Sequence, residues 1–150
     1  MSTSFRALQS EYQHLWSTMQ LRQEVLSDLD RIVGIISSHK SDYEKVQAAT
    51  GVPWYVIAGI HNLEGSLNFT THLHNGDPLS ARTHQVPPGR PKSGSPPFPW
   101  SVSAIDALTD QLKGSWKSVP GWSIPAMLWK CEMYNGEGYI DFIYNLTYNH

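Results

Sequence analysis

Apolar residues recur at steps of three and four near the start of the chain. One stripe runs through residues 5–19 (Phe5, Leu8, Tyr12, Leu15 and Met19), and a second runs through residues 25–36 (Val25, Leu29, Ile32, Val33 and Ile36). This spacing places the apolar side chains on one face of an α-helix. The pattern predicts either one long helix or two helices with a break near residues 19–22.

Two further helices are expected before residue 67. Ser41 and Asp42 are suited to cap the start of a short helix, and Gly51 is suited to end it. Pro53 fits the first turn of the next helix, which we expect to continue to about residue 64 or 66. This helix is the most apolar in the chain, so we place it at the centre of the fold.

The pattern changes between residues 68 and 100, where most of the ten prolines of the chain lie. Proline removes backbone donors and breaks helices, and long irregular stretches in compact domains are usually functional or disordered. Because this stretch directly follows the central helix and holds several side chains capable of chemistry, we expect its first half to be functional. Residues 87–99 could equally form a mobile rim.

Helices are expected to resume at Ser101 or Ser103, with Gly114 as a stop, and again after residues 123–125. The expected fold is therefore mainly α, with five or six helices and one loop-rich lobe that has room for a small hairpin. At 150 residues, the chain is about the size of one domain, and we expect residues 1–150 to form one.

Composition narrows the class of protein further. A formal net charge of -2 argues against a nucleic-acid partner, and the longest apolar run is too short to span a bilayer. Cys131 is the single cysteine, so no intrachain disulfide can form. The start of the chain lacks a signal-peptide pattern. We expect a monomer made in the cytoplasm without a leader and released to the periplasm or cell wall by another route.

Glu64 is the first candidate for chemistry, because it stands at the end of the apolar helix. Burial there would raise the pKa of its carboxyl. A carboxylic acid that stays protonated near neutral pH can donate a proton to a glycosidic oxygen. A glutamate at a helix end is otherwise usually solvated surface.

Asp77 and Thr83 follow in the irregular stretch. A second carboxylate can stabilise an oxocarbenium-like transition state or act as a base toward water, and a threonine hydroxyl can help to hold that water. Asp77 is an equally good turn residue, since it stands in the sequence Asn75-Gly76-Asp77-Pro78.

The histidines support a rival hypothesis. His72 and His74 could bind zinc, with His61, Asp77 or His84 as further ligands, as in a peptidase acting on peptide stems. Arg82, Arg90 and Lys92 form a mild basic cluster that could contact carboxylates of a substrate.

Two motifs resemble families of the lysozyme superfamily. Residues 129–136 (WKCEMYNG) are similar to the Tyr-Asn-x-Gly element of soluble lytic transglycosylases and goose-type lysozymes, in which a helix ends in a Tyr-Asn pair beside the substrate cleft. These families place a catalytic Glu at the end of a central helix, followed by Ser. Here Gly65 stands between Glu64 and Ser66.

Glu64, Asp77 and Thr83 also resemble the Glu–Asp–Thr triad of phage-type lysozymes, with the same Asp-to-Thr interval and a longer Glu-to-Asp interval. Residues 72–79 (HLHNGDPL), 82–83 (RT) and 89–91 (GRP) are similar to a stretch found in a further group of bacterial and phage proteins of this superfamily.

The resemblance implies a lysozyme-like fold, with a helical lobe and a loop-rich lobe on the two sides of a cleft, that cleaves the glycan strands of bacterial peptidoglycan. Glu64 is then the acid, Asp77 stabilises positive charge or directs water, and Thr83 positions that water. The substrate contacts it implies are Tyr134, Asn135, Arg82, His74 and Trp100. No metal ion or other cofactor is expected. A lytic transglycosylase using the same Glu64, and a glycan-binding module without catalysis, remain alternatives.

Overall fold

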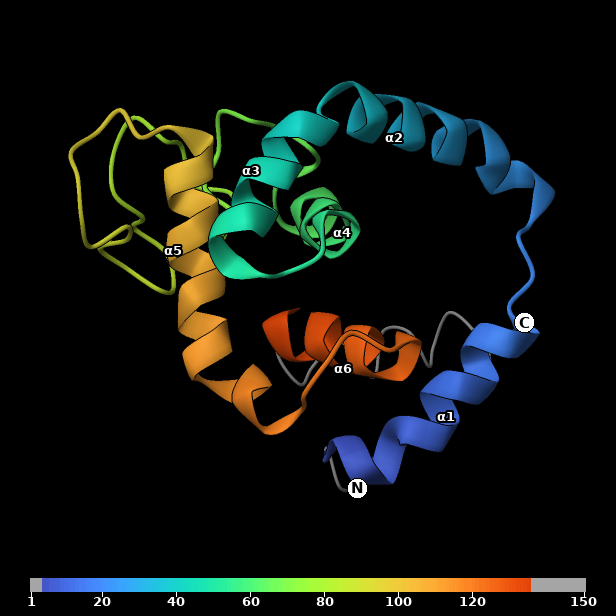
Figure 1. Ribbon diagram of the computed structural model, residues 1–150. Helices are drawn as coiled ribbons and strands as arrows, with labels where there is room; N and C mark the ends of the chain where they lie inside the picture. Colours follow the sequence, from blue (N-terminus) through green and yellow to red (C-terminus); the bar gives the residue numbers. More distant parts are fainter. Residues whose placement is uncertain (1–3, 136–150) are drawn as a thin grey trace. The chain divides into compact units, whose positions relative to one another are not determined.

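The computed structural model describes residues 4–135 (Figure 1). Its helices are α1 (Phe5–Thr18), α2 (Leu26–Ser38), α3 (Lys40–Thr50), α4 (Trp54–Gly65), α5 (Trp100–Lys113) and α6 (Ile124–Asn135), with short 3-10 helices η1 (Gln23–Val25) and η2 (Ser115–Ser118). The described part is mainly α, as the hydrophobic pattern predicted. Within it, the expected hairpin is reduced to one isolated bridge between Thr71 and Pro78. No helix of residues 4–135 is long and apolar enough to cross a membrane.

The chain forms two compact units. One unit contains residues 1–20 and 111–150, of which 4–20 and 111–135 are described. Here α1 packs against α6, and η2 also contacts α6. Trp116 on η2 is buried, and its indole N–H donates a hydrogen bond to the backbone oxygen of Lys130 on α6 at 2.9 Å. An apolar core around Trp116 therefore holds this unit together.

The second unit contains residues 21–110. In it α3 packs against α4, and α2 contacts the start of α3. The largest apolar side chains that are fully buried in this unit come from α3, α4, α5 and the loop between α4 and α5: Tyr43, Ile57, Ile60, Leu73 and Leu108. The apolar α4 predicted from the sequence thus lies in the core of the unit that contains Glu64.

Most helix ends follow from local sequence. The predicted break between α1 and α2 is present, and Gly51 ends α3 in the left-handed conformation (φ 76), with its N–H bonded to the oxygen of Gln47 at 2.7 Å. The expected cap of α3 was wrong, because the helix begins at Lys40 and His39 is the N-cap. Asp42 lies inside the first turn, where its carboxylate pairs with side chains instead of the backbone. Pro53 likewise precedes α4 as its N-cap residue, one position before the predicted one.

Candidate functional site

Glu64 lies on the last turn of α4, where the helix gives way to the irregular loop of residues 66–99. The two residues that end the helix, Ser66 (φ 49) and Leu67 (φ 60), are both left-handed although neither is glycine. This conformation costs a residue with a side chain about 1–2 kcal/mol. The N–H groups of both residues are bonded to the backbone oxygen of His61, which holds the turn in place. Strained backbone of this kind clusters at functional sites.

The side chain of Glu64 is half-buried and, among residues 4–135, forms no hydrogen bond or ion pair. Burial is the cause of its perturbed titration: desolvation disfavours the carboxylate and raises the pKa of Glu64 from 4.5 to about 7. Near neutral pH such a group is present in both forms. It can therefore donate a proton in one step of a reaction and accept one in the next.

Two glycines allow the loop to close against this end of α4. A Cβ atom on Gly76 (φ 78) would lie 2.8 Å from the backbone oxygen of Glu64, and a Cβ atom on Gly65 would lie 2.9 Å from Oγ1 of Thr71. Both distances are shorter than van der Waals contact, and at Gly76 the neighbour is backbone, so only glycine permits the approach there. The loop therefore rests directly on the segment that carries Glu64.

His61, one turn before the end of α4, is fully buried and bonded at both ring nitrogens. Its Nε2–H donates to the oxygen of Asn68 at 3.2 Å, and its Nδ1 accepts the hydroxyl of Tyr43 at 3.0 Å. Burial is the main cause that lowers the pKa of His61, which favours the neutral ring. His61 therefore joins α4 to α3 and to the loop, and its nitrogens are already occupied.

The carboxylate of Asp77 organises the loop. Its Oδ2 accepts the backbone N–H groups of His84 at 2.8 Å and Gln85 at 3.0 Å, and the side-chain amide of Asn75 at 3.1 Å. These bonds, that from Gln85 first, lower the pKa of Asp77 and keep it ionised at neutral pH. Its Oδ1 accepts no hydrogen bond from the described residues. Asp77 is thus the turn residue that the sequence allowed, and it presents an ionised carboxylate as well.

Thr83 is buried at the base of the turn formed by residues 83–90. Its hydroxyl donates to the oxygen of Pro87 and accepts the N–H of Arg90 at 2.9 Å, and its own N–H donates to the oxygen of Arg90 at 2.9 Å. The hydroxyl proton is therefore used within the protein. The role that these contacts show for Thr83 is to close the turn.

His72 and His74 belong to a buried network between the loop and α5. Nδ1 of His72 accepts the hydroxyl of Ser103, and its Nε2–H donates to the oxygen of Ala81, both at 2.8 Å. Nε2 of His74 lies 2.9 Å from Oδ2 of Asp106, which also pairs with Nε of Arg90 at 2.8 Å. The guanidinium of Arg90 continues the network to Asp110.

These contacts bear on the zinc hypothesis. Both ring nitrogens of His72 have protein partners, and the side chain of His74 is only 3% exposed. Across residues 4–135, no three histidine, cysteine, aspartate or glutamate side chains are grouped so that they could hold a metal ion. The two histidines are instead part of the framework that attaches the loop to α5.

The remaining predicted substrate contacts are distributed over both units. Arg82 donates from Nη2 to the oxygen of Gly94 at 2.7 Å and lies over the ring of Phe98. Trp100 is 7% exposed and packs in an aromatic cluster with Tyr43, His61 and Phe69. Tyr134 belongs to the unit of residues 111–135, where it contacts Trp116. The side chain of Asn135 lies outside the part that the structure describes.

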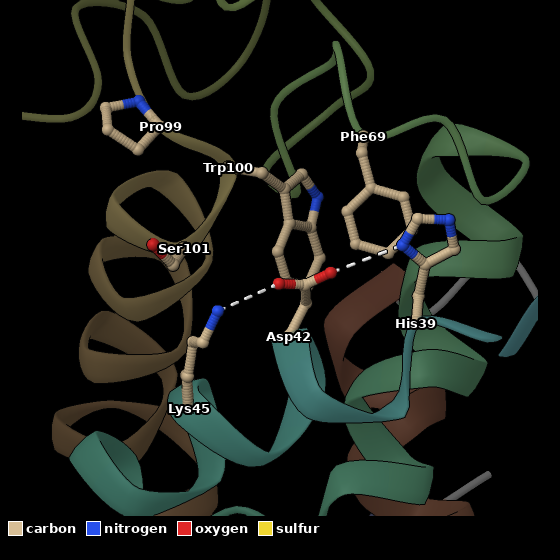
Figure 2. A pocket seen from close by; sticks show the side chains of 7 residues that line it. All are labelled: His39, Asp42, Lys45, Phe69, Pro99, Trp100 and Ser101. Carbon is tan, nitrogen blue, oxygen red and sulfur yellow. Dashed lines mark hydrogen bonds and ion pairs between the residues drawn. The ribbon is translucent and has the colours of Figure 1, made fainter. Parts of the chain in front are cut away.

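One pocket was not predicted from the sequence. It has a volume of about 270 Å³ and is lined by His39, Asp42, Lys45, Phe69, Pro99, Trp100 and Ser101 (Figure 2). The three charged or titratable residues are spaced three apart, which places them on one side of a helix. This spacing is the feature of the sequence that could have predicted the pocket, but Asp42 was interpreted as a helix cap.

Comparisons with protein-family models, with curated proteins and with solved structures give no match to this chain. A functional assignment therefore depends on the residues of the site.

Proposed function

We propose that this protein is a glycosidase that cleaves the glycan backbone of bacterial peptidoglycan, with Glu64 as the general acid. The observation that carries the proposal is the half-buried carboxyl of Glu64, which has no partner among residues 4–135 and whose pKa is raised to about 7. Cleavage of the bond between N-acetylmuramic acid and N-acetylglucosamine requires a proton on the glycosidic oxygen. A carboxyl that remains partly protonated at neutral pH supplies that proton.

The strained turn at Ser66 and Leu67 supports the same assignment. A backbone that maintains two left-handed residues must be held by its surroundings, and here those surroundings fix the end of the helix that carries Glu64. The motif resemblance adds the lysozyme-like fold and its cleft to the proposal.

Two reactions can begin from one acidic Glu64. In hydrolysis, Asp77 stabilises the positive charge on the sugar or directs water, and its lowered pKa provides the ionised carboxylate which that role needs. In lytic transglycosylation, Glu64 acts first as acid and then as base, and the hydroxyl of muramic acid closes an anhydro ring. The three donors on Oδ2 of Asp77 favour this second candidate, because they commit half of the carboxylate to the loop.

Mass spectrometry of the fragments released from purified peptidoglycan tests the proposal. We expect Glu64→Gln to reduce release about a thousandfold, since a general acid contributes 10²–10⁴-fold. Glu44→Gln is the matched control, because Glu44 is an exposed glutamate that pairs with Lys40 on α3. Reducing ends identify hydrolysis, and anhydro ends identify transglycosylation.

The reaction is run with a chelator present. Fragments released equally by wild type and Glu64→Gln would contradict the assignment of Glu64. Fragments released only when the chelator is left out would instead indicate a metal-dependent peptidase reaction.

A further inference from the structure

The pocket at the start of α3 and α5 combines charges with apolar walls (Figure 2). Asp42 lies between two cationic or titratable partners: Oδ1 pairs with Nζ of Lys45 and Oδ2 pairs with Nδ1 of His39, both at 3.2 Å. In Figure 2, His39 and Phe69 lie on one side of this carboxylate, and Ser101 lies on the other. These pairs are exposed enough to meet a ligand, since the side chains of Lys45 and Asp42 are 69% and 38% exposed.

A second hollow shares one lining residue, Phe69, with the first. It has a volume of about 430 Å³, and its walls are Thr70, Pro78, Leu79, Ser80, Pro97 and Phe98. Proline and aromatic side chains provide apolar faces, while the hydroxyls of Thr70 and Ser80 are exposed at the edge. Glu64 lines neither hollow.

The chemistry of this surface excludes several ligand classes. A phosphate monoester or nucleotide brings two or more negative charges, and the single lysine of the pocket already faces the carboxylate of Asp42. An extended peptide that binds by main-chain pairing needs an open strand edge, and residues 4–135 contain only the isolated bridge between Thr71 and Pro78. A lipid tail would leave the charges of Asp42 and Lys45 buried against hydrocarbon.

A sugar ring satisfies each part of the pocket. Its C–H face packs on an apolar wall, and its hydroxyls bond at the rim. A carboxylate substituent pairs with the ammonium of Lys45, and an acetamido N–H donates to the carboxylate of Asp42. Both substituents occur together on a muramic-acid type of sugar. The volume of about 270 Å³ suits a single ring, and the second hollow, which shares Phe69, offers space for a neighbouring ring.

We infer that the pocket of His39, Asp42, Lys45 and Phe69 is a glycan subsite, separate from Glu64, that recognises an N-acetylated sugar bearing a carboxylate. This inference rests on the proposed function for the identity of the substrate. The subsite selects acidic over neutral glycan strands through Lys45, and it binds both kinds through the part of Phe69 that stays exposed beside His39.

Calorimetric titration of the full chain tests the inference, with Glu64→Gln as the background so that the ligand is not cleaved. The probes are a peptide-free tetrasaccharide of alternating N-acetylglucosamine and N-acetylmuramic acid, and the neutral tetramer of N-acetylglucosamine. We expect the acidic probe to bind about tenfold more tightly, as one added charge-assisted contact provides. Lys45→Met should remove this preference, and Phe69→Leu should weaken both probes about tenfold.

Lys40→Met is the matched control, because Lys40 is a lysine of the same helix that pairs with Glu44 and lies outside the pocket. Lys45 is largely exposed, so Lys45→Met remains informative if Phe69→Leu fails to fold. Equal affinities for the two probes, or affinities unchanged by Lys45→Met, would overturn the inference.

The two proposals fail separately. If wild type releases no glycan fragments but the acidic probe binds in a manner that depends on Lys45, the role of Glu64 is wrong and the subsite stands. If release depends on Glu64 while Lys45→Met and Phe69→Leu bind as the background does, the subsite is wrong and the role of Glu64 stands.

Discussion

Ionisable groups differ in their partners between the end of α4 and the network that joins the loop to α5. In the network, His74, Arg90 and Asp106 are all largely buried, and each faces a partner of suitable charge. At the end of α4, Glu64 is half-buried with no partner among residues 4–135, and its pKa rises to about 7. The network uses buried charge to hold the loop in place, whereas Glu64 retains a proton that it can transfer.

This difference distinguishes a buried ionisable group with a structural role from one that can exchange protons. A buried charge with a partner is stabilised in one protonation state, so it has little tendency to exchange protons near neutral pH. A buried carboxyl without a partner has a pKa close to the pH at which it works. The sequence singles out His72 and His74 for chemistry, but in the structure their ring nitrogens are bonded to Ser103, Ala81 and Asp106.

The largest expected effect comes from removing a charge from the network. Asp106→Ala leaves Arg90 and His74 without their shared partner, and we expect the free energy of unfolding to fall by about 3 kcal/mol. Asp110→Ala is the matched control, since Asp110 also pairs with Arg90 but is 57% exposed, and it should cost less than about 1 kcal/mol. Urea titrations measure both values. Equal losses would show that Asp106 does not hold the network.

The pH dependence of activity tests the other region of this comparison, the end of α4. Because the pKa of Glu64 is about 7 and the protonated form donates, kcat/KM should decline above pH 7, approaching tenfold per pH unit. Rates of glycan release between pH 5 and pH 9 provide the test. A profile that stays level to pH 9 would exclude Glu64 as the acid.

Stability should respond to Glu64 in the same pH range. The pKa of Glu64 is higher in the folded protein than in the unfolded chain. The free energy of unfolding is therefore at its full value, as far as this group is concerned, below pH 4.5, and it falls as pH rises through about 7. Glu64→Gln does not titrate, and we expect it to gain about 1–2 kcal/mol over wild type between pH 4.5 and pH 8, after allowing for solvent screening. Thermal or urea unfolding at the two pH values measures the gain. An identical difference at both would contradict the raised pKa.

The smallest effect concerns the turn that follows Glu64. Ser66→Gly removes the strain of a left-handed serine, partly offset by the entropy of glycine, and should stabilise the protein by roughly 0.5 kcal/mol. Ser10→Gly, at an exposed position inside α1, should instead destabilise it by roughly 0.5 kcal/mol. Melting temperatures distinguish the two signs. A loss of stability in Ser66→Gly would mean that the side chain contributes more than the strain costs.

Local pattern predicted most of the helices but few of the side-chain roles. Apolar periodicity located α1, α2 and α4, and it placed Glu64 at the end of a buried helix, because these features depend on neighbours a few residues away. The partners of His72 and His74 are Ser103 and Asp106, about thirty residues further along the chain. A single sequence gives no information on which distant residues meet.

The same limit explains Trp100 and Thr83. A tryptophan before a helix and a threonine in a loop are equally compatible with a substrate groove and with internal packing. In the structure the indole packs against Tyr43 and Phe69, and the hydroxyl of Thr83 closes a turn with Pro87. The pocket at Asp42 shows the opposite case, because a residue that the sequence assigned to capping lines a pocket instead.

Gly76 determines how freely this part of the sequence can vary. Gly51 and Gly89 share its left-handed backbone (φ 76 and 74), and a Cβ atom at either would meet nothing within 4 Å. Under random mutagenesis, asparagine should therefore be accepted at positions 51 and 89, since it tolerates this conformation best among residues with side chains. Position 76 should accept no replacement, because any Cβ there meets the carbonyl of Glu64. The contact between the loop and the segment that carries Glu64 therefore depends on the absence of a side chain at position 76.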